Sequence, residues 1–310
     1  MGLARETLLW ASRSEWLGRQ FQRRSFSRRA ARRFIPGEDL AAALAAAQSL
    51  EPHGITSLVT LLGENVSTAS AAEQVTQHYL AAMDQIKERG LNCQISIKLT
   101  QLGLDLGDQA CAQHLDRLIT RAAEQRTRVW VDMEGSEYVG RTMDLVLAAR
   151  QKHENVGVCL QAYLHQVGAD LERVMAAGMA VRLVKGAYKE PAEIAIQRKR
   201  DVDAHYLKLA TRVIDGLVAG AGGFPAFGTH DMNLVAQINQ MAAAKGVARD
   251  SYEFEMLYGI CREHQLALAA AGNQMRVLIS YGTAWFPWYM RRLAERPANV
   301  WFVVKNLFVR

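Results

Sequence analysis

Residues 156–185, VGVCLQAYLHQVGADLERVMAAGMAVRLVK, contain two short apolar runs on either side of a helical segment. The runs are VGVCLQ at 156–161 and VRLVK at 181–185, and each ends in a polar residue. Strands that are apolar along their whole length and separated by helices are typical of a parallel sheet covered on both faces. We therefore predict a strand–helix–strand unit in this stretch.

The same alternation extends in both directions along the 310 residues. Six further apolar runs alternate with helical segments: 57–63 (SLVTLLG), 94–99 (QISIKL), 128–134 (RVWVDME), 225–230 (PAFGTH), 252–257 (YEFEML) and 276–282 (RVLISYG). Eight strand–helix units in about 250 residues fit a closed (β/α)8 barrel. The sequence thus predicts an α/β protein with a TIM-type barrel.

An open, doubly wound sheet is the alternative arrangement of such units. It usually carries a GxGxxG dinucleotide motif directly after its first strand. Here the first run is followed by Glu64-Asn65-Val66-Ser67, and the glycine-rich stretch GAGG at 220–223 precedes a strand instead of following one. The pattern therefore favours the barrel.

The net charge of +6 comes from the N-terminal segment. Residues 1–33 hold nine arginines and two glutamates, whereas the rest of the chain has 28 basic and 29 acidic side chains. A neutral body argues against nucleic-acid binding. We predict a basic and alanine-rich helical segment at 1–50, in which Gly37-Glu38-Asp39 opens a helix at 40–50, and a barrel at 51–310. The arginines form either a solvated helix face or a contact with an acidic membrane surface.

The cysteines and the apolar runs bear on the compartment. The four cysteines form no CxxC pair and no zinc-like spacing, so we expect reduced thiols in a reducing compartment and no metal site. Charged residues interrupt every apolar run before the roughly 20 residues that a spanning helix needs. We expect a cytoplasmic protein, with peripheral contact at the inner membrane as an option. The mitochondrial matrix is an alternative, because an arginine-rich start also occurs in transit peptides.

Active sites of (β/α)8 barrels lie at the C-terminal ends of the strands. Polar residues near the ends of the predicted strands are Lys98, Asp132, Glu134, Gln161, Lys185, Thr229 and His230. Arg182 lies inside an apolar run, and a buried charge without a partner is costly. It therefore needs an anionic ligand or an acidic partner from among Asp132, Glu134, Glu253 and Glu255. Lys185-Gly186 and Thr229-His230 suit a phosphate, although ordinary turns have the same composition.

The aromatic-rich segment 283–296 (TAWFPWYMRRLAER) carries two adjacent arginines, Arg291 and Arg292. Arginine binds carboxylates through two parallel hydrogen bonds and stays charged at any working pH. Glu295 is four residues after Arg291, a helical spacing that allows an ion pair. The segment is therefore either a carboxylate clamp or a solvated ion pair.

With these segments in order, the chain resembles the flavin-dependent proline dehydrogenases, most closely the small monofunctional bacterial type. The matching blocks are 96–107 (SIKLTQLGLDLG), 131–134 (VDME), 161–164 (QAYL), 181–188 (VRLVKGAY), 228–231 (GTHD), 254–259 (FEMLYG) and 291–295 (RRLAE). The resemblance implies a barrel whose eighth helix lies over the mouth, and FAD bound without GxGxxG. It also implies oxidation of proline to Δ1-pyrroline-5-carboxylate, with a hydride passing from C5 to flavin N5 and the electrons to a membrane quinone.

The resemblance also implies roles for particular residues. Arg291 and Arg292 would hold the substrate carboxylate, with Glu295 orienting one of them and Lys98 as a further cation. The residues expected at the reacting centre are Asp132, near the substrate amine, and Arg182, near flavin N5. Met133 and Gln161 would contact the flavin. The residues expected to hold the ribityl–pyrophosphate–adenosine portion are Lys185, Gly186, Ala187, Thr229 and His230.

The chain departs from the family pattern at three positions. Leu278 stands where the family usually has a tyrosine that contacts the substrate ring, and Tyr281 is predicted on the opposite strand face. This change leaves a substituted substrate such as hydroxyproline as an alternative to proline. Glu255 replaces a usual glutamine, and Lys189 replaces a usual aromatic residue.

Overall fold

A computed structural model describes residues 33–286 and residue 290. Eight parallel strands form a closed barrel in chain order, and β8 pairs with β1. The strands are β1 (Ile55–Leu61), β2 (Cys93–Ile97), β3 (Val129–Val131), β4 (Val156–Gln161), β5 (Ala180–Val184), β6 (Pro225–Gly228), β7 (Glu253–Leu257) and β8 (Gln274–Tyr281). All eight predicted strands are present, so the predicted (β/α)8 fold is confirmed.

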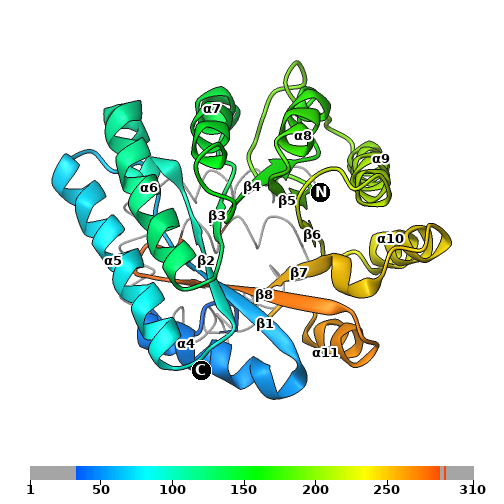
Figure 1. Ribbon diagram of the computed structural model, residues 1–310, viewed down its shortest axis with the longest axis horizontal. Coiled ribbons are helices and arrows are strands. Elements are labelled where there is room, and N and C mark those ends of the chain that lie inside the picture. Colours follow the sequence, from blue (N-terminus) through cyan, green and yellow to red (C-terminus); the bar gives the residue numbers. More distant parts are fainter. Residues whose placement is uncertain (1–32, 287–289, 291–310) are drawn as a thin grey trace, which may run out of the picture.

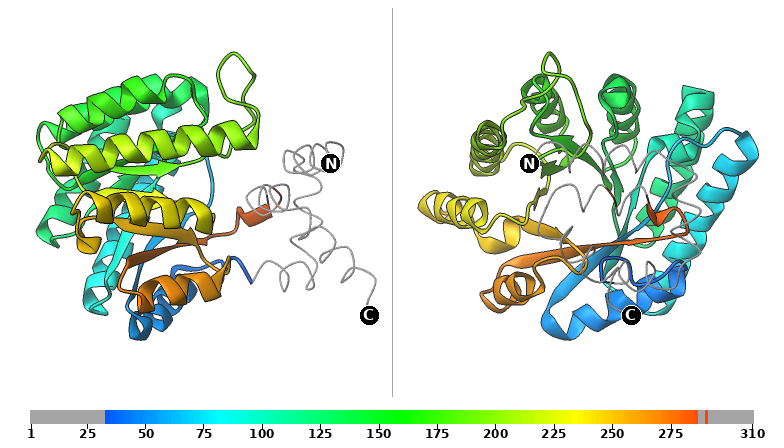
Figure 2. Two further views of the ribbon diagram at one scale, coloured as in Figure 1. Left: turned by 90° about the vertical axis from the view of Figure 1, so that its right-hand side faces the viewer. Right: turned by 180° about the vertical axis from the view of Figure 1, so that it is seen from behind.

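Helices surround the strands on the outside of the barrel (Figures 1 and 2). The described α-helices are α4 (Leu40–Leu50), α5 (Ala69–Glu88), α6 (Asp108–Glu124), α7 (Val139–Arg150), α8 (Val167–Ala176), α9 (Lys199–Val218), α10 (Met232–Ala244) and α11 (Arg262–Ala270). Short 3-10 turns are η1 (Glu51–His53), η2 (Leu99–Leu102), η3 (Leu104–Leu106), η4 (Ser136–Tyr138) and η5 (Arg249–Ser251). Helix α4 has the predicted bounds, because Asp39 caps it by accepting a hydrogen bond from the Ala42 N–H at 2.7 Å.

Alternate residues of each strand face opposite sides, so the barrel has an outer and an inner core. The outer core lies between strands and helices and contains, among others, Val59, Ile97, Val131, Val158 and Leu183. The inner core is a separate cluster of Leu58, Trp130, Ala180 and Ala226, with Leu278 packed against it. Tyr281 faces outward, where its hydroxyl lies 2.7 Å from Nε2 of His78 on α5. The prediction that Tyr281 and Leu278 lie on opposite faces is thus confirmed.

The two ends of the described chain meet beside the barrel. Trp285, which follows β8, is buried and donates a hydrogen bond from Nε1 to Oε1 of Glu38 at 3.1 Å. Residues 1–32 of the helical segment predicted at 1–50 lie outside the described residues, as does most of the segment expected to form a helix over the mouth. Within the part of the chain that the structure describes, no helix is both long and apolar enough to cross a bilayer.

Candidate active site

Arg182 of β5 points into the barrel and is only 2% exposed. Its Nη1 donates to Oε2 of Glu255 at 3.1 Å, and its Nη2 donates to Asp132 and to Oγ of Ser96, the latter at 2.8 Å. The guanidinium carbon lies 5.2 Å from the centre of the Trp130 ring, within the range of a cation–π contact. Asp132 and Glu255 were both among the predicted partners of Arg182, and the structure brings them to the same guanidinium.

Burial and charge act in opposite directions on this cluster. Burial lowers the pKa of Arg182, but the attraction of Glu255 and Asp132 outweighs it, so the pKa lies above its ordinary value. Burial raises the pKa of Glu255 to about 7, against the opposing attraction of Arg182. Oε1 of Glu255 is buried and accepts no hydrogen bond from any described residue. Arg182 is therefore a fixed cation, whereas Glu255 is a carboxyl group that titrates near neutrality.

Lys98 and Asp132 extend the cluster towards the strand ends. Nζ of Lys98 lies 3.8 Å from Oδ2 of Asp132, whose Oδ1 also accepts a hydrogen bond from Oγ of Ser96 at 2.8 Å. The side chains of Lys98 and Asp132 are 12% and 18% exposed, more than that of Arg182. The structure therefore joins three of the predicted substrate-site and reacting-centre residues, and two of them are accessible to a small ligand.

Glu134, another of the four predicted partners of Arg182, forms its hydrogen bonds with other residues. Its carboxylate accepts hydrogen bonds from the backbone N–H of Thr100, at 3.1 Å, and from the Thr100 hydroxyl. Burial raises the pKa of Glu134 to about 7. Its backbone oxygen accepts a hydrogen bond from Nε2 of Gln161 at 2.8 Å. Glu134 therefore positions the turn after β2 and the Gln161 amide, while the adjacent Met133 is buried.

Lys185, predicted to bind a phosphate, is held by two carboxylates. Its Nζ contacts Asp203 on α9 and lies 3.2 Å from Oδ2 of Asp231, which caps α10. An ammonium group has three protons, so two carboxylate contacts leave one for a ligand. The side chain of Lys185 is 25% exposed, so that proton can be reached from solvent. The sequence reasoning included Asp231 only within the block 228–231 and did not identify Asp203, because no local pattern joins either residue to Lys185.

Thr229 and His230 follow β6 and directly precede Asp231, one of the two carboxylates on Lys185. Oγ1 of Thr229 accepts a hydrogen bond from the Asp231 N–H at 3.1 Å, and a hydroxyl that accepts in this way can still donate its own proton. Nε2 of His230 accepts from the Leu257 N–H at 3.0 Å. That bond places the proton of the neutral imidazole on Nδ1. The Thr229 hydroxyl thus keeps a proton of the kind that phosphate oxygens accept.

Gly186 has a backbone that other residues cannot easily adopt. Its φ angle is +114°, and a Cβ atom would lie 2.2 Å from Cδ1 of the Tyr163 ring. The chain therefore needs glycine here so that the loop after β5 can pass close to Tyr163. The next N–H, that of Ala187, donates to Oε1 of Gln161 at 3.4 Å, which links the loops after β4 and β5.

A second buried ion pair lies deeper in the barrel. Nε of Arg276 on β8 donates to Oε1 of Glu253 on β7 at 2.9 Å, and Nη1 donates to the Ser57 backbone oxygen at 2.9 Å. The sequence reasoning identified neither this pair nor Ser96 and Trp130 of the Arg182 cluster. The available signal was the position of Arg276 at the start of an apolar run, which parallels that of Arg182.

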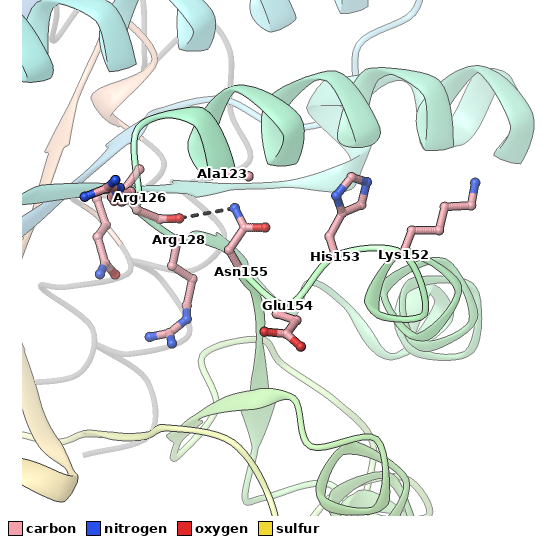
Figure 3. A pocket seen from close by; sticks show the side chains of 9 residues that line it. Ala123, Arg126, Arg128, Lys152, His153, Glu154 and Asn155 are labelled. Atoms are coloured by element: carbon pink, nitrogen blue, oxygen red, sulfur yellow. Dashed lines mark hydrogen bonds between the residues drawn. The ribbon is translucent and has the colours of Figure 1, made fainter.

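A hollow lies at the opposite end of the barrel from this site, where residues that precede β3 and β4 line it (Figure 3). It has a volume of about 500 Å³, and its lining residues include Arg126, Arg128, His153 and Asn155. His153 is engaged by Asp116 at 2.8 Å, and Asn155 donates to the Thr127 backbone oxygen at 3.2 Å. Active sites of (β/α)8 barrels lie at the other end, so we assign the site to the Arg182 cluster.

Three predicted substrate residues, Arg291, Arg292 and Glu295, lie outside the described residues. Leu278 lies within them and packs on the inner core that contains Trp130, whose ring also contacts Arg182. Among the described residues, no group of three or more His, Cys, Asp or Glu side chains is arranged to hold a metal ion.

A closed (β/α)8 barrel with a buried arginine–carboxylate cluster towards its strand ends has the architecture of a barrel enzyme. The family model described as "Proline dehydrogenase" matches residues 43–305. Proline dehydrogenase 1 of Bacillus subtilis (strain 168) is 35% identical over 305 residues, which cover 98% of this chain and 99% of the relative. Proline dehydrogenase of Deinococcus radiodurans is 33% identical, with 89% of each chain covered. The chain therefore belongs to the proline dehydrogenase family, and these relatives are of the small monofunctional bacterial type.

The solved structures agree with the fold. A crystal structure of proline utilization A from Bdellovibrio bacteriovorus, inactivated by N-propargylglycine, superimposes with a TM-score of 0.81 at 20% identity. The match covers 93% of this chain and 38% of that longer chain. At this identity the likeness supports the barrel fold and nothing finer.

Proposed function

We propose that this protein is an FAD-dependent proline dehydrogenase that oxidises L-proline to Δ1-pyrroline-5-carboxylate, the first oxidation in the breakdown of proline. The observation that carries the proposal is the contact between Lys98, Asp132 and Arg182 towards the C-terminal strand ends of a family barrel. This cluster offers cations and a carboxylate within reach of one small zwitterion. Membership of the family supplies the substrate class.

The residues present fit FAD. Polar and small residues lie at the ends of three neighbouring strands: Gln161 is the last residue of β4, Gly186 and Ala187 follow β5, and Thr229 and His230 follow β6. The close approach of the loop at Gly186 and the remaining proton of Lys185 suit a pyrophosphate. Met133 and Gln161 would contact the flavin ring. When bound, FAD would accept the hydride from substrate C5 at its N5 atom.

The side chains then orient the substrate. Arg291 and Arg292 would hold the proline carboxylate, with Glu295 orienting the clamp and Lys98 adding a charge. Asp132 would lie near the amine, where a carboxylate favours the ammonium form until the proton leaves. Arg182, held by Asp132 and Glu255, would stabilise negative charge that develops near flavin N5. The protein thus contributes orientation and electrostatics, and the fixed geometry lowers the entropic part of the barrier.

We further propose that the electrons pass to a membrane quinone and that the protein works in the cytoplasm, with peripheral contact at the inner membrane. The arginine-rich residues 1–33 are the segment suited to an acidic lipid surface. Removing residues 1–30 should preserve activity with a dye acceptor and reduce co-sedimentation with anionic vesicles. Equal sedimentation of both forms would remove the membrane role.

The function is tested by assaying the purified protein with a dye acceptor against L-proline, trans-4-hydroxy-L-proline and pyrrolidine. We expect the highest kcat/KM with L-proline, and very low activity with pyrrolidine because it lacks the carboxylate. Absence of turnover with every cyclic amino acid would overturn the proposal. Higher kcat/KM with hydroxyproline would reassign the substrate.

A further inference from the structure

Glu255 is a buried carboxyl group that its surroundings satisfy only in part. The residue is 4% exposed, and only Oε2 makes a hydrogen bond to a described residue, Nη1 of Arg182. The guanidinium that it contacts is already paired with Asp132. Two carboxylates therefore share one arginine, and one buried oxygen has no described partner.

The charge of the cluster depends on this single group. With Glu255 ionised, the cations Arg182 and Lys98 balance the anions Asp132 and Glu255, and the cluster is neutral. With Glu255 protonated, the cluster has a charge of +1. The other titratable groups that act on Glu255 or on its guanidinium partner are Glu253 on the same strand, Arg276 on β8, Arg128 before β3, Tyr206 on α9 and Cys159 on β4.

The charges of those further groups largely cancel one another. Glu253 and Arg276 pair with each other, so the deeper layer is close to neutral. Burial raises the pKa of Tyr206 well above its ordinary value and raises the pKa of Cys159 to about 11. Both groups are therefore uncharged at neutral pH. Arg128 lies at the far end of the barrel, beside the Trp130 and Phe224 rings. Glu255 is therefore the carboxyl group of this interior whose protonation changes the charge beside Arg182.

We propose that Glu255 is a charge-regulating residue: it takes up a proton when negative charge forms next to Arg182, and so sets the redox potential of the bound flavin and the dependence of that potential on pH. This inference rests on the proposed function. In that reaction the C5–H bond of the neutral amine form of proline would break, and the hydrogen would pass to the flavin with both bond electrons as a hydride. The nitrogen loses one proton as the C=N bond forms. Glu255 takes up one proton from solvent, so charge and electrons balance without another reactant.

The protonation of Glu255 is tested first without reference to flavin, by denaturant unfolding of the full-length protein and of Glu255→Gln. Burial raises the folded-state pKa of Glu255 to about 7 from an ordinary 4.5, so the folded state binds the proton more tightly. The contribution of Glu255 to the free energy of unfolding is thus greatest below about pH 4.5 and falls as the pH rises towards 7. The unfolding constant of the natural protein, divided by that of the variant, should rise up to about ten-fold per pH unit across this window. A ratio independent of pH overturns the proposal.

The second measurement is the midpoint potential of the bound flavin, at about pH 5.5 and about pH 8, in the same two proteins. At the higher pH we expect Glu255→Gln to increase the equilibrium constant for flavin reduction at least ten-fold. For a two-electron couple this corresponds to a midpoint potential that is higher by about 30 mV. At the lower pH the two proteins should agree, because Glu255 is then protonated. Equal potentials at both pH values overturn the redox role.

Glu253→Gln is the matched control, because it removes a buried carboxylate from the same strand. It should lower stability by weakening the Arg276 pair and, because the Glu253 charge helps to raise the pKa of Glu255, move the Glu255 titration to lower pH. The flavin potential should still depend on pH, because Glu255 itself remains. If this control abolishes the pH dependence as well, the effect is general to buried carboxylates and the assignment to Glu255 is wrong. A protein that binds no flavin would refute the proposed function, while the unfolding ratio would still decide whether Glu255 titrates.

Discussion

Arg182 on β5 and Glu255 on β7 meet across the intervening strand β6, with Nη1 of Arg182 3.1 Å from Oε2 of Glu255. The residues of β6 in register with them are Ala226 and Gly228. Because these two have almost no side chain, they leave room for the longer side chains of β5 and β7 to touch inside the barrel. The small residues of one strand thus determine the ion pair between its neighbours.

Replacing Arg182 by methionine should destabilise the fold by about 3–5 kcal/mol, because it leaves the buried Glu255 carboxylate without its cation and leaves Asp132 with Lys98 alone. Denaturant unfolding at neutral pH measures the loss. The double variant Arg182→Met with Glu255→Gln should recover part of it, since the stranded Glu255 charge is then removed. Equal stability of the single and double variants would show that Glu255 does not depend on Arg182.

Gly186→Ala should lower stability by about 1–3 kcal/mol and weaken FAD binding, because the new Cβ meets the Tyr163 ring at 2.2 Å and φ is +114°. Gly140→Ala in α7 is the matched control. A Cβ there meets nothing within 4 Å, so that variant should gain about 0.5–1 kcal/mol. Unfolding curves and FAD titration measure both effects. A neutral result for Gly186→Ala would mean that the loop after β5 moves freely.

The strands were predictable because their whole length is apolar. Run 156–161 coincides with β4, and the predicted helix at 40–50 coincides with α4. The run 128–134 was too long, because the strand itself comprises only Val129–Val131, although the Asp132 N–H still donates to the Ile97 backbone oxygen at 2.8 Å. Such ends depend on pairing with neighbours, which a single run does not reveal.

The sequence predicted which polar residues lie at the strand ends, but not which of them contact one another. Whether Arg182 faced the helices or the interior depended on a phase of one residue, and the structure shows that it faces inward. The carboxylates on Lys185 come from α9 and from the turn after β6, so no local pattern indicated them. Arg276 and Glu253 likewise meet only because β7 and β8 are adjacent.

Leu278→Tyr should raise the ratio of kcat/KM for proline to kcat/KM for trans-4-hydroxy-L-proline by about ten-fold. The larger side chain on the inner core would leave less space for a substituent on the substrate ring. Steady-state kinetics with both substrates measure this ratio. Leu278→Phe separates the aromatic ring from the hydroxyl. An unchanged ratio in both variants would show that this position does not contact the substrate.

Arg291→Met should raise the KM for proline by about 100-fold, since a charged hydrogen bond to the carboxylate is lost, while FAD stays bound. Arg291→Lys, which keeps the charge but not the paired hydrogen-bond geometry, should have an intermediate KM. Kinetics together with the flavin spectrum distinguish loss of substrate affinity from loss of cofactor. An unchanged KM in Arg291→Met would remove the clamp assignment.

In the proposed reaction, the Lys98–Asp132–Arg182 cluster and a bound flavin together oxidise L-proline. The most direct test of this reaction is anaerobic addition of L-proline to the purified protein while the flavin absorbance is followed and the cyclic imine product is trapped. We expect a yellow protein that L-proline bleaches, with one imine formed for each flavin reduced. A protein that carries no flavin, or a flavin that stays oxidised in excess L-proline, would contradict the proposed reaction.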